Sequence, residues 1–213
     1  MKYVMYPHGG SGNHGCEAIV RSSVKLIGGD VTLFSNKVEE DEKARLNSVC
    51  AMDVTEKPIV RRSFSYLKAF FKSRVLGNQK AFDELVFHHI IDKAKSSDYF
   101  LSIGGDNYCY DTPEFIYLVN RMVDEAKVKR ILWGASVEPE AIDERMLQDL
   151  RGYHKIWARE SLTYQALLDK GLTQTFLLPD PAFVLDRIDL PLPDGFVEGN
   201  TVGINVSPMI IGY

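Results

Sequence analysis

The chain has 213 residues, 45% hydrophobic and 11% aromatic, which is enough apolar material for a core of ordinary size. Its 25 basic and 29 acidic residues give a net charge of −4 without a sustained basic stripe, so nucleic acid is not expected as the main partner. The cysteines, Cys16, Cys50 and Cys109, lack CxxC spacing and indicate neither a disulfide framework nor a structural zinc site.

The N-terminus reaches a histidine and glycines too soon for a signal peptide, and no apolar run has the length of a membrane span. A soluble, cytoplasmic protein is therefore expected.

The predicted elements alternate between strands and helices along the whole chain. The expected strands are 2–6, 31–35, 50–55, the start of 98–106, 130–136, 154–159 and the start of 174–181. The expected helices are 15–28, 62–76, 80–95, 114–127, 140–152 and 160–171. Alternation on this scale predicts an α/β fold with a mainly parallel sheet covered by helices on both faces.

The composition changes after residue 185. Residues 186–200 are rich in proline, glycine and aspartate, as in a linker, and residues 201–208 have the pattern of a new strand. We expect one domain over 1–185, a linker over 186–200, and in 201–213 the first strand of a second domain that is cut short.

A glycine-rich loop joins the first predicted strand to the first predicted helix. Gly9, Gly10, Gly12 and Gly15 allow close approach of a ligand, and the following helix N-terminus could receive a phosphate or carboxylate. The spacing matches neither a Walker A motif nor GxGxxG. The alternative is that these glycines only permit a tight turn.

Several polar residues in and after this loop have two interpretations. Cys16 is either a thiol activated by the helix N-terminus or a buried packing residue. Glu17 either complements the helix dipole or accepts a proton from a sugar hydroxyl. His8 and His14 lack a third ligand for a metal, so hydrogen bonding is the expected role.

A second glycine loop ends the strand at 98–106. Asp106 and Asn107 follow Gly104 and Gly105 directly, so their side chains are expected at the ligand edge as an acceptor and a donor for hydroxyls. The alternative is an Asx turn or a helix cap.

Taken in order, the motifs resemble those of the polysaccharide pyruvyl transferase family. They are 13-NHGCEAI-19, 103-IGGDNYCYD-111, 133-WGASVEP-139, 158-ARESLTYQALLDKG-171 and 179-PDPAF-183. The resemblance implies the Rossmann-like, doubly wound N-terminal half of a two-domain, GT-B-like enzyme. This half would hold the acceptor, and a C-terminal half would hold phosphoenolpyruvate.

The implied activity is transfer of a pyruvyl group from phosphoenolpyruvate to a sugar as a ketal, in the synthesis of cell-surface exopolysaccharide. The implied partners are phosphoenolpyruvate, a sugar or glycolipid acceptor, the missing C-terminal half, and a membrane reached peripherally through a lipid-linked acceptor. Phosphoenolpyruvate is a co-substrate; no cofactor or metal is expected. The 213-residue chain is expected to have no turnover alone.

The resemblance also implies a set of site residues. Glu17 or Asp106 is the expected base; the family often has an aspartate at the position of Cys16, whose role here would fall to Glu17 or be absent. Asn13, His14 and Asn107 are expected to hold acceptor hydroxyls. The remaining expected binding residues are Gly10, Gly15, Gly104, Gly105, Gly134, Arg159 and Ser161.

Two other functions remain open at this point. One is a non-catalytic module that binds nucleotides or sugar phosphates, because Rossmann-like sheets carry many functions. The other is a cysteine-dependent hydrolase or transferase in which His14 activates Cys16.

Overall fold

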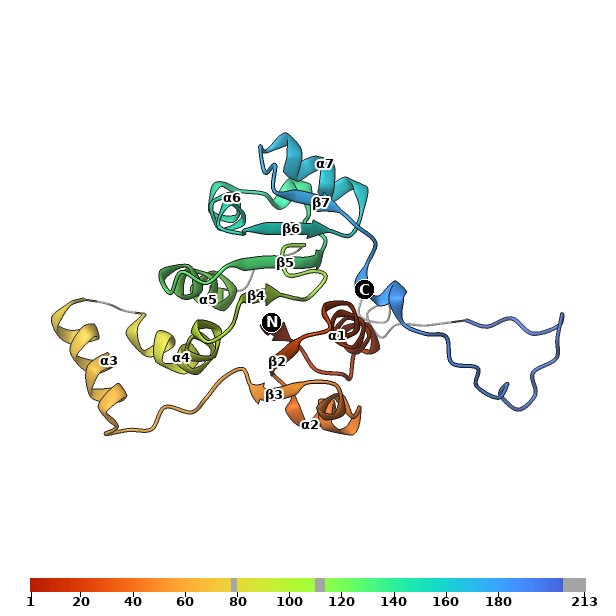
Figure 1. Ribbon diagram of the computed structural model, residues 1–213, viewed down its shortest axis with the longest axis horizontal. Helices are drawn as coiled ribbons and strands as arrows, with labels where there is room; N and C mark the ends of the chain where they lie inside the picture. The colour runs from red at the N-terminus through yellow and green to blue at the C-terminus, as the bar shows by residue number, and fades with distance from the viewer. Residues whose placement is uncertain (78–79, 110–113, 205–213) are drawn as a thin grey trace.

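A computed structural model describes residues 1–77, 80–109 and 114–204 and contains one parallel sheet (Figure 1). Among the described residues the strand order is β3-β2-β1-β4-β5-β6-β7. The strands are β1 (Lys2–His8), β2 (Asp30–Ser35), β3 (Ala51–Val54), β4 (Tyr99–Ser102), β5 (Arg130–Ala135), β6 (Lys155–Ala158) and β7 (Thr175–Leu177). All neighbouring strands pair in parallel, which confirms the predicted α/β class.

Helices connect these strands and cover both faces of the sheet (Figure 1). The α-helices are α1 (His14–Ile27), α2 (Val38–Lys43), α3 (Phe64–Val75), α4 (Ala81–Lys95), α5 (Glu114–Glu125), α6 (Glu144–Arg151) and α7 (Ser161–Asp169). Short 3-10 helices are η1 (Leu46–Ser48), η2 (Pro139–Ala141) and η3 (Pro181–Val184). Among the described residues, every helix is too short or too polar to cross a bilayer.

The core has an apolar layer on each face of the sheet. Val4 and Tyr6 of β1 pack with Ile90 of α4 on one face, whereas Met5 packs with Val20 of α1 on the other. Successive side chains of a strand point to opposite faces, so a strand covered on both sides is apolar at every position. This explains why the β1 sequence has no alternating pattern.

The strand order reverses between β1 and β4, which lie side by side at the centre of the sheet. In a doubly wound sheet, this reversal opens a crevice at the carboxyl ends of the two strands, where ligands bind. Here these ends are His8 and Ser102, and the glycine loops follow directly.

The amino ends of the strands hold a buried ionic cluster instead. The Arg130 side chain, at the start of β5, is fully buried and bonds Asp124 through two nitrogens at 2.7 Å each. Its guanidinium also lies 4.2 Å above the Tyr153 ring. Such a paired, buried cation at the edge opposite the crevice has a structural role.

Three elements differ from the sequence-based expectation. Helix α6 begins only at Glu144, because Asp143 caps it by accepting a hydrogen bond from the Met146 amide at 2.7 Å. Helix α2 was not predicted at all. Residues 201–204 are in no strand, and the rest of the expected second-domain strand lies outside the described residues.

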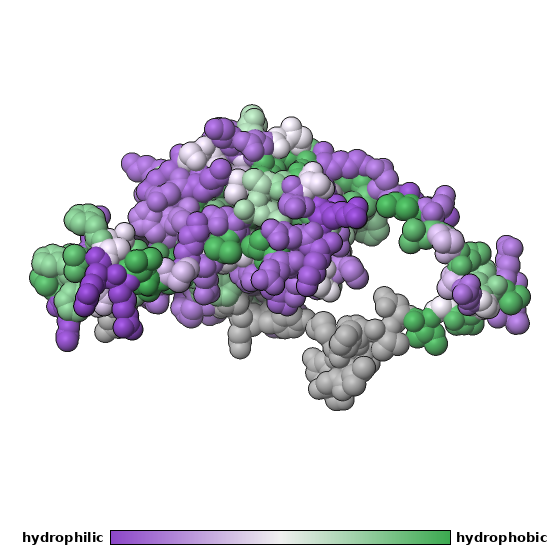
Figure 2. All heavy atoms as spheres, turned by 90° about the horizontal axis from the view of Figure 1, so that it is seen from below, coloured by the Kyte–Doolittle hydropathy of each residue, from purple (hydrophilic) through white to green (hydrophobic). Residues whose placement is uncertain are grey.

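Helix α3 stands on the outer side of α4 and contacts that helix (Figure 1). Figure 2 shows hydrophobic and strongly hydrophilic side chains next to each other at this end of the molecule.

Candidate functional site at the carboxyl edge of the sheet

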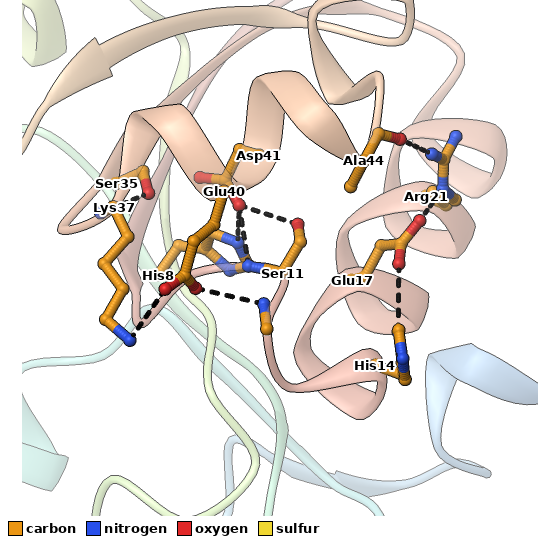
Figure 3. Close-up of polar contacts among 11 residues, drawn as sticks. His8, Ser11, His14, Glu17, Arg21, Ser35, Lys37, Glu40, Asp41 and Ala44 are labelled. Atoms are coloured by element: carbon orange, nitrogen blue, oxygen red, sulfur yellow. Dashed lines mark hydrogen bonds and ion pairs between the residues drawn. The ribbon is translucent and has the colours of Figure 1, made fainter.

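The first glycine loop is held by two carboxylates from α2 (Figure 3). Asp41 Oδ1 accepts hydrogen bonds from the Ser11 amide at 2.8 Å and the Ser11 hydroxyl at 2.6 Å. Glu40 Oε2 accepts one from the Gly12 amide at 3.1 Å. The amides of Ser11 and Gly12, which could have received an external anion, therefore already bind carboxylates of the same chain.

Close packing explains why glycines occur in this loop. Gly10 has a φ of +107°, and a Cβ there would lie 2.8 Å from Glu40 Oε2 and 2.9 Å from Cβ of Lys37. A Cβ at Gly12 would lie 2.7 Å from the same Glu40 oxygen. Both glycines make room for α2, so the tight-turn interpretation describes them better than approach to a ligand does.

His8 and Asp41 form a buried pair beneath this loop. His8 Nε2 lies 2.9 Å from Asp41 Oδ1, and both side chains are almost completely buried. Burial alone would raise the pKa of Asp41, but hydrogen bonds from Ser11 and the neighbouring His8 outweigh it and lower that pKa. The expected hydrogen-bonding role of His8 is confirmed. Asp41 was missed, because nothing in the acidic run 38-VEEDEK-43 distinguishes it from a solvated charge.

The N-terminus of α1 organises the next group of candidate residues (Figure 3). Asn13 caps the helix by accepting a hydrogen bond from the Gly15 amide at 2.9 Å. Glu17 bonds Arg21 Nε at 2.7 Å and lies 3.5 Å from His14 Nδ1. The His14 side chain is exposed. The Glu17 carboxylate is thus already engaged by a cation on its own helix.

Asp106 lies near α1 and near the end of its own loop. Its charge contributes, after burial, to raising the thiol pKa of both Cys16 and Cys109. A raised pKa keeps Cys16 protonated, which opposes its role as an activated nucleophile and favours the packing interpretation. Among the described residues, the Asp106 side chain forms no ion pair or hydrogen bond.

Asn107 uses its amide group within the loop. Its Nδ2 donates to the Ile103 carbonyl at 2.7 Å. Gly104, with a φ of +112°, leaves space for this side chain, because a Cβ there would lie 2.6 Å from Asn107 Oδ1. The Asn107 amide nitrogen is therefore engaged within its own loop, by a bond to a preceding carbonyl that is neither an Asx turn nor a helix cap.

Arg159, at the end of β6, connects three loops at this edge. Its Nε donates to Ser136 Oγ at 2.9 Å, and its Nη1 lies 3.0 Å from Asp180 Oδ2. The guanidinium covers Gly105, where a Cβ would lie 2.5 Å from Arg159 Cζ. Asp180 and Ser136 were not predicted as site residues, although both lie within the motifs that resemble the family, 179-PDPAF-183 and 133-WGASVEP-139.

Gly134 and Ser161 occupy supporting positions. Gly134 has a φ of +65° and allows close packing of Pro181, whose Cδ would lie 2.7 Å from an added Cβ. Ser161 is the exposed first residue of α7, and Glu160 caps that helix by accepting from the Leu162 and Thr163 amides. No contact that the structure describes directs the Ser161 side chain toward Asp106 or Arg159.

The predicted residues therefore meet at one edge of the sheet. Asn13 begins the helix that carries Cys16, Cys16 is within electrostatic range of Asp106, and Gly105 beside Asp106 contacts Arg159.

A cleft of about 450 Å³ lies elsewhere, between α3, α4 and α5, and none of the candidate site residues line it. Within the described part of the chain, no group of three potential ligands could hold a metal ion.

A doubly wound parallel sheet whose strand order reverses between β1 and β4 defines an α/β protein of the Rossmann-like class. The family model for polysaccharide pyruvyl transferase matches residues 13–209. The chain therefore belongs to the polysaccharide pyruvyl transferase family, a family of transferases, as its motifs indicated. No curated protein matches the chain.

Proposed function

We propose that the protein transfers the pyruvyl group of phosphoenolpyruvate to two hydroxyls of a sugar, as a cyclic ketal, during the synthesis of a cell-surface polysaccharide. The observation that carries this proposal is the family match over 13–209. The meeting of Asp106, Arg159 and the α1 N-terminus at the carboxyl edge supports it.

The reaction adds two sugar oxygens to the central carbon of the donor. A proton enters the donor methylene and turns it into a methyl group, which leaves positive charge on the adjacent carbon. One sugar hydroxyl attacks that carbon and loses its proton; phosphate then leaves, and the second hydroxyl closes the ring. One proton ends on the methyl group and the other on phosphate, so the step requires one acid and one base.

Asp106 is the proposed base. A base needs a free lone pair within reach of the acceptor hydroxyl, and no described side chain engages the Asp106 carboxylate. Glu17 is bonded to Arg21 at 2.7 Å, so its proposed role is to hold the first turn of α1 in place. Asn13 and His14 are proposed to bind acceptor hydroxyls from the same turn.

Arg159 is proposed to fix the shape of the acceptor side. It binds Asp180 and Ser136 and covers Gly105, so it holds the loop of Asp106 against two neighbouring loops. Phosphoenolpyruvate is the only co-substrate in this scheme, which uses no cofactor.

The test measures phosphate release from phosphoenolpyruvate by the full-length protein with a panel of glycan and lipid-linked acceptors, and identifies the ketal by mass spectrometry. Replacing Asp106 with asparagine should lower kcat by about 10² to 10⁴ without loss of folding. Asp189→Asn, at an exposed position, is the matched control and should leave kcat unchanged.

Two results would contradict the proposal. Full activity of Asp106→Asn together with an inactive Glu17→Gln would move the base to Glu17. Binding of nucleotides or nucleotide sugars in calorimetry, without ketal formation for any acceptor, would instead support the non-catalytic binding module.

A further inference from the structure

The net charge of −4 conceals an uneven distribution. Residues 57–80 contain seven basic side chains and no acidic one, whereas the remainder holds 18 basic and 29 acidic residues, a net charge of −11. The seven are Lys57, Arg61, Arg62, Lys68, Lys72, Arg74 and Lys80. This segment contains α3, so the basic charge is concentrated on one projecting helix and its flanks (Figure 1).

Helix α3 presents its large apolar side chains to the outside. Phe64, Leu67, Phe71 and Val75 are 84%, 56%, 55% and 63% exposed. They are spaced i, i+3, i+7 and i+11, so they lie on one face of the helix. The side chain that α3 buries is the small Ala69, at 5% exposure. A helix whose role was only to cover α4 would have the opposite arrangement.

Basic side chains flank this apolar stripe. At 100° per residue, Lys68 and Lys72 lie on one side of the stripe and Arg74 lies on the other. Lys72 Nζ lies 3.8 Å from Glu84 Oε2. Among the described residues, Lys68 and Arg74 form no ion pair. The same holds for Arg61 and Arg62 before the helix. Figure 2 shows the resulting mixture of hydrophobic and strongly hydrophilic surface at this end.

We propose that α3 lies in the interface of an anionic phospholipid bilayer, with its apolar stripe among the acyl chains and its basic flanks at the lipid phosphates. An outward apolar stripe bordered by Lys and Arg is the arrangement that binds such interfaces. The inference stands on α3 and its flanks, and it does not rest on the proposed transfer reaction.

Charge decides against the other occupants of this surface. In a symmetric pair of α3 helices from two copies of the chain, the same basic flanks would face each other and repel. A nucleic acid would neutralise the basic side chains but would leave the stripe of four large apolar residues in water. An anionic lipid surface satisfies both features at once.

The test is flotation of the whole protein with vesicles of two compositions: phosphatidylcholine alone, and equal parts of phosphatidylcholine and phosphatidylglycerol. Binding is expected to the anionic vesicles, to weaken as salt rises, and to be weak with phosphatidylcholine alone. Equal binding to both compositions, or binding to neither, would overturn the proposal.

Two sets of variants locate the contact. Removing three charges with R61Q, K68Q and R74Q should weaken binding about fivefold per charge, or about a hundredfold together. The charge-matched control carries K43Q, K129Q and K170Q and should bind like the unaltered protein. The apolar variant F64S, L67S and F71S should lose binding, whereas L162S, F183S and I188S, at exposed positions elsewhere, should retain it.

All altered side chains in the first set are exposed, so thermal unfolding should change little. If the charge-depleted α3 variant floats like its control, the proposal fails. It also fails if light scattering shows a dimer for the unaltered protein and a monomer for the apolar variant, while neither of these two proteins binds vesicles. A second copy of the chain would then be the occupant.

Discussion

Replacing Gly105 with alanine should displace Arg159 and loosen the carboxyl edge. The added Cβ would meet Arg159 Nη1 first and would lie 2.5 Å from Cζ and 2.9 Å from Nη2, so the guanidinium would have to move by about 1.5 Å to reach ordinary contact. Gly105 does not have a positive φ, so its backbone conformation suits alanine. The effect of the substitution is therefore steric and directed at one side chain.

The cost follows from the two contacts that this movement breaks. Arg159 loses the bond to Ser136 at 2.9 Å and the ion pair with Asp180 at 3.0 Å. The Arg159 and Asp180 side chains are 27% and 21% exposed, so water screens part of the pair. Together the loss should lower the free energy of unfolding by about 1–2 kcal/mol.

A double-mutant cycle in urea denaturation tests this reasoning. In a background of Arg159→Ala, Gly105→Ala should cost less than about 0.5 kcal/mol, because the side chain that it displaces is gone. The matched control is Gly9→Ala, since a Cβ at Gly9 meets no atom within 4 Å. An equal cost of Gly105→Ala with and without Arg159 would refute the proposed contact.

Two further substitutions test the electrostatics of the same edge. Asp106→Asn should lower the thiol pKa of Cys16 and raise its alkylation rate at mildly alkaline pH severalfold. Cys50 should react as before, because its pKa of about 11 is set by burial and by the charges of Asp41 and Arg21. An unchanged alkylation rate of Cys16, measured by peptide mass spectrometry, would show that the Asp106 charge does not act on the first turn of α1. Asp41→Asn should destabilise the protein by about 1–3 kcal/mol at neutral pH. Folding lowers the pKa of Asp41, so this difference in the free energy of unfolding should be fully present above the ordinary pKa of 3.8 and should disappear as pH falls through the folded pKa. An equal difference at pH 7 and pH 3 in urea denaturation would contradict this expectation.

The fold was predictable because its signals are local. Apolar runs bounded by glycines located every strand of the described sheet, and the alternation of strands with helices predicted a parallel sheet covered on both faces. The family resemblance added a domain arrangement, which stays a prediction because no described element belongs to a second domain.

Helix α2 shows where local signals are insufficient. It has six residues, five of them charged, and its N-cap Lys37 makes no capping side-chain bond, so neither periodicity nor a cap marks it. Yet Glu40 and Asp41 from this helix hold the first glycine loop. Their partners are about 30 residues earlier in the chain, and a contact at that separation leaves no trace in sequence spacing.

The glycines of this edge also change how its chemistry is interpreted. Gly12 makes room for Glu40, Gly105 for Arg159 and Gly134 for Pro181, so each serves contact between segments of the chain. A glycine-rich loop after a strand is thus weak evidence for a bound phosphate here, because loop amides already hold carboxylates. A charge that the described fold leaves unpaired is a better candidate for a catalytic group than a paired one, and for this reason Asp106 rather than Glu17 is proposed as the base.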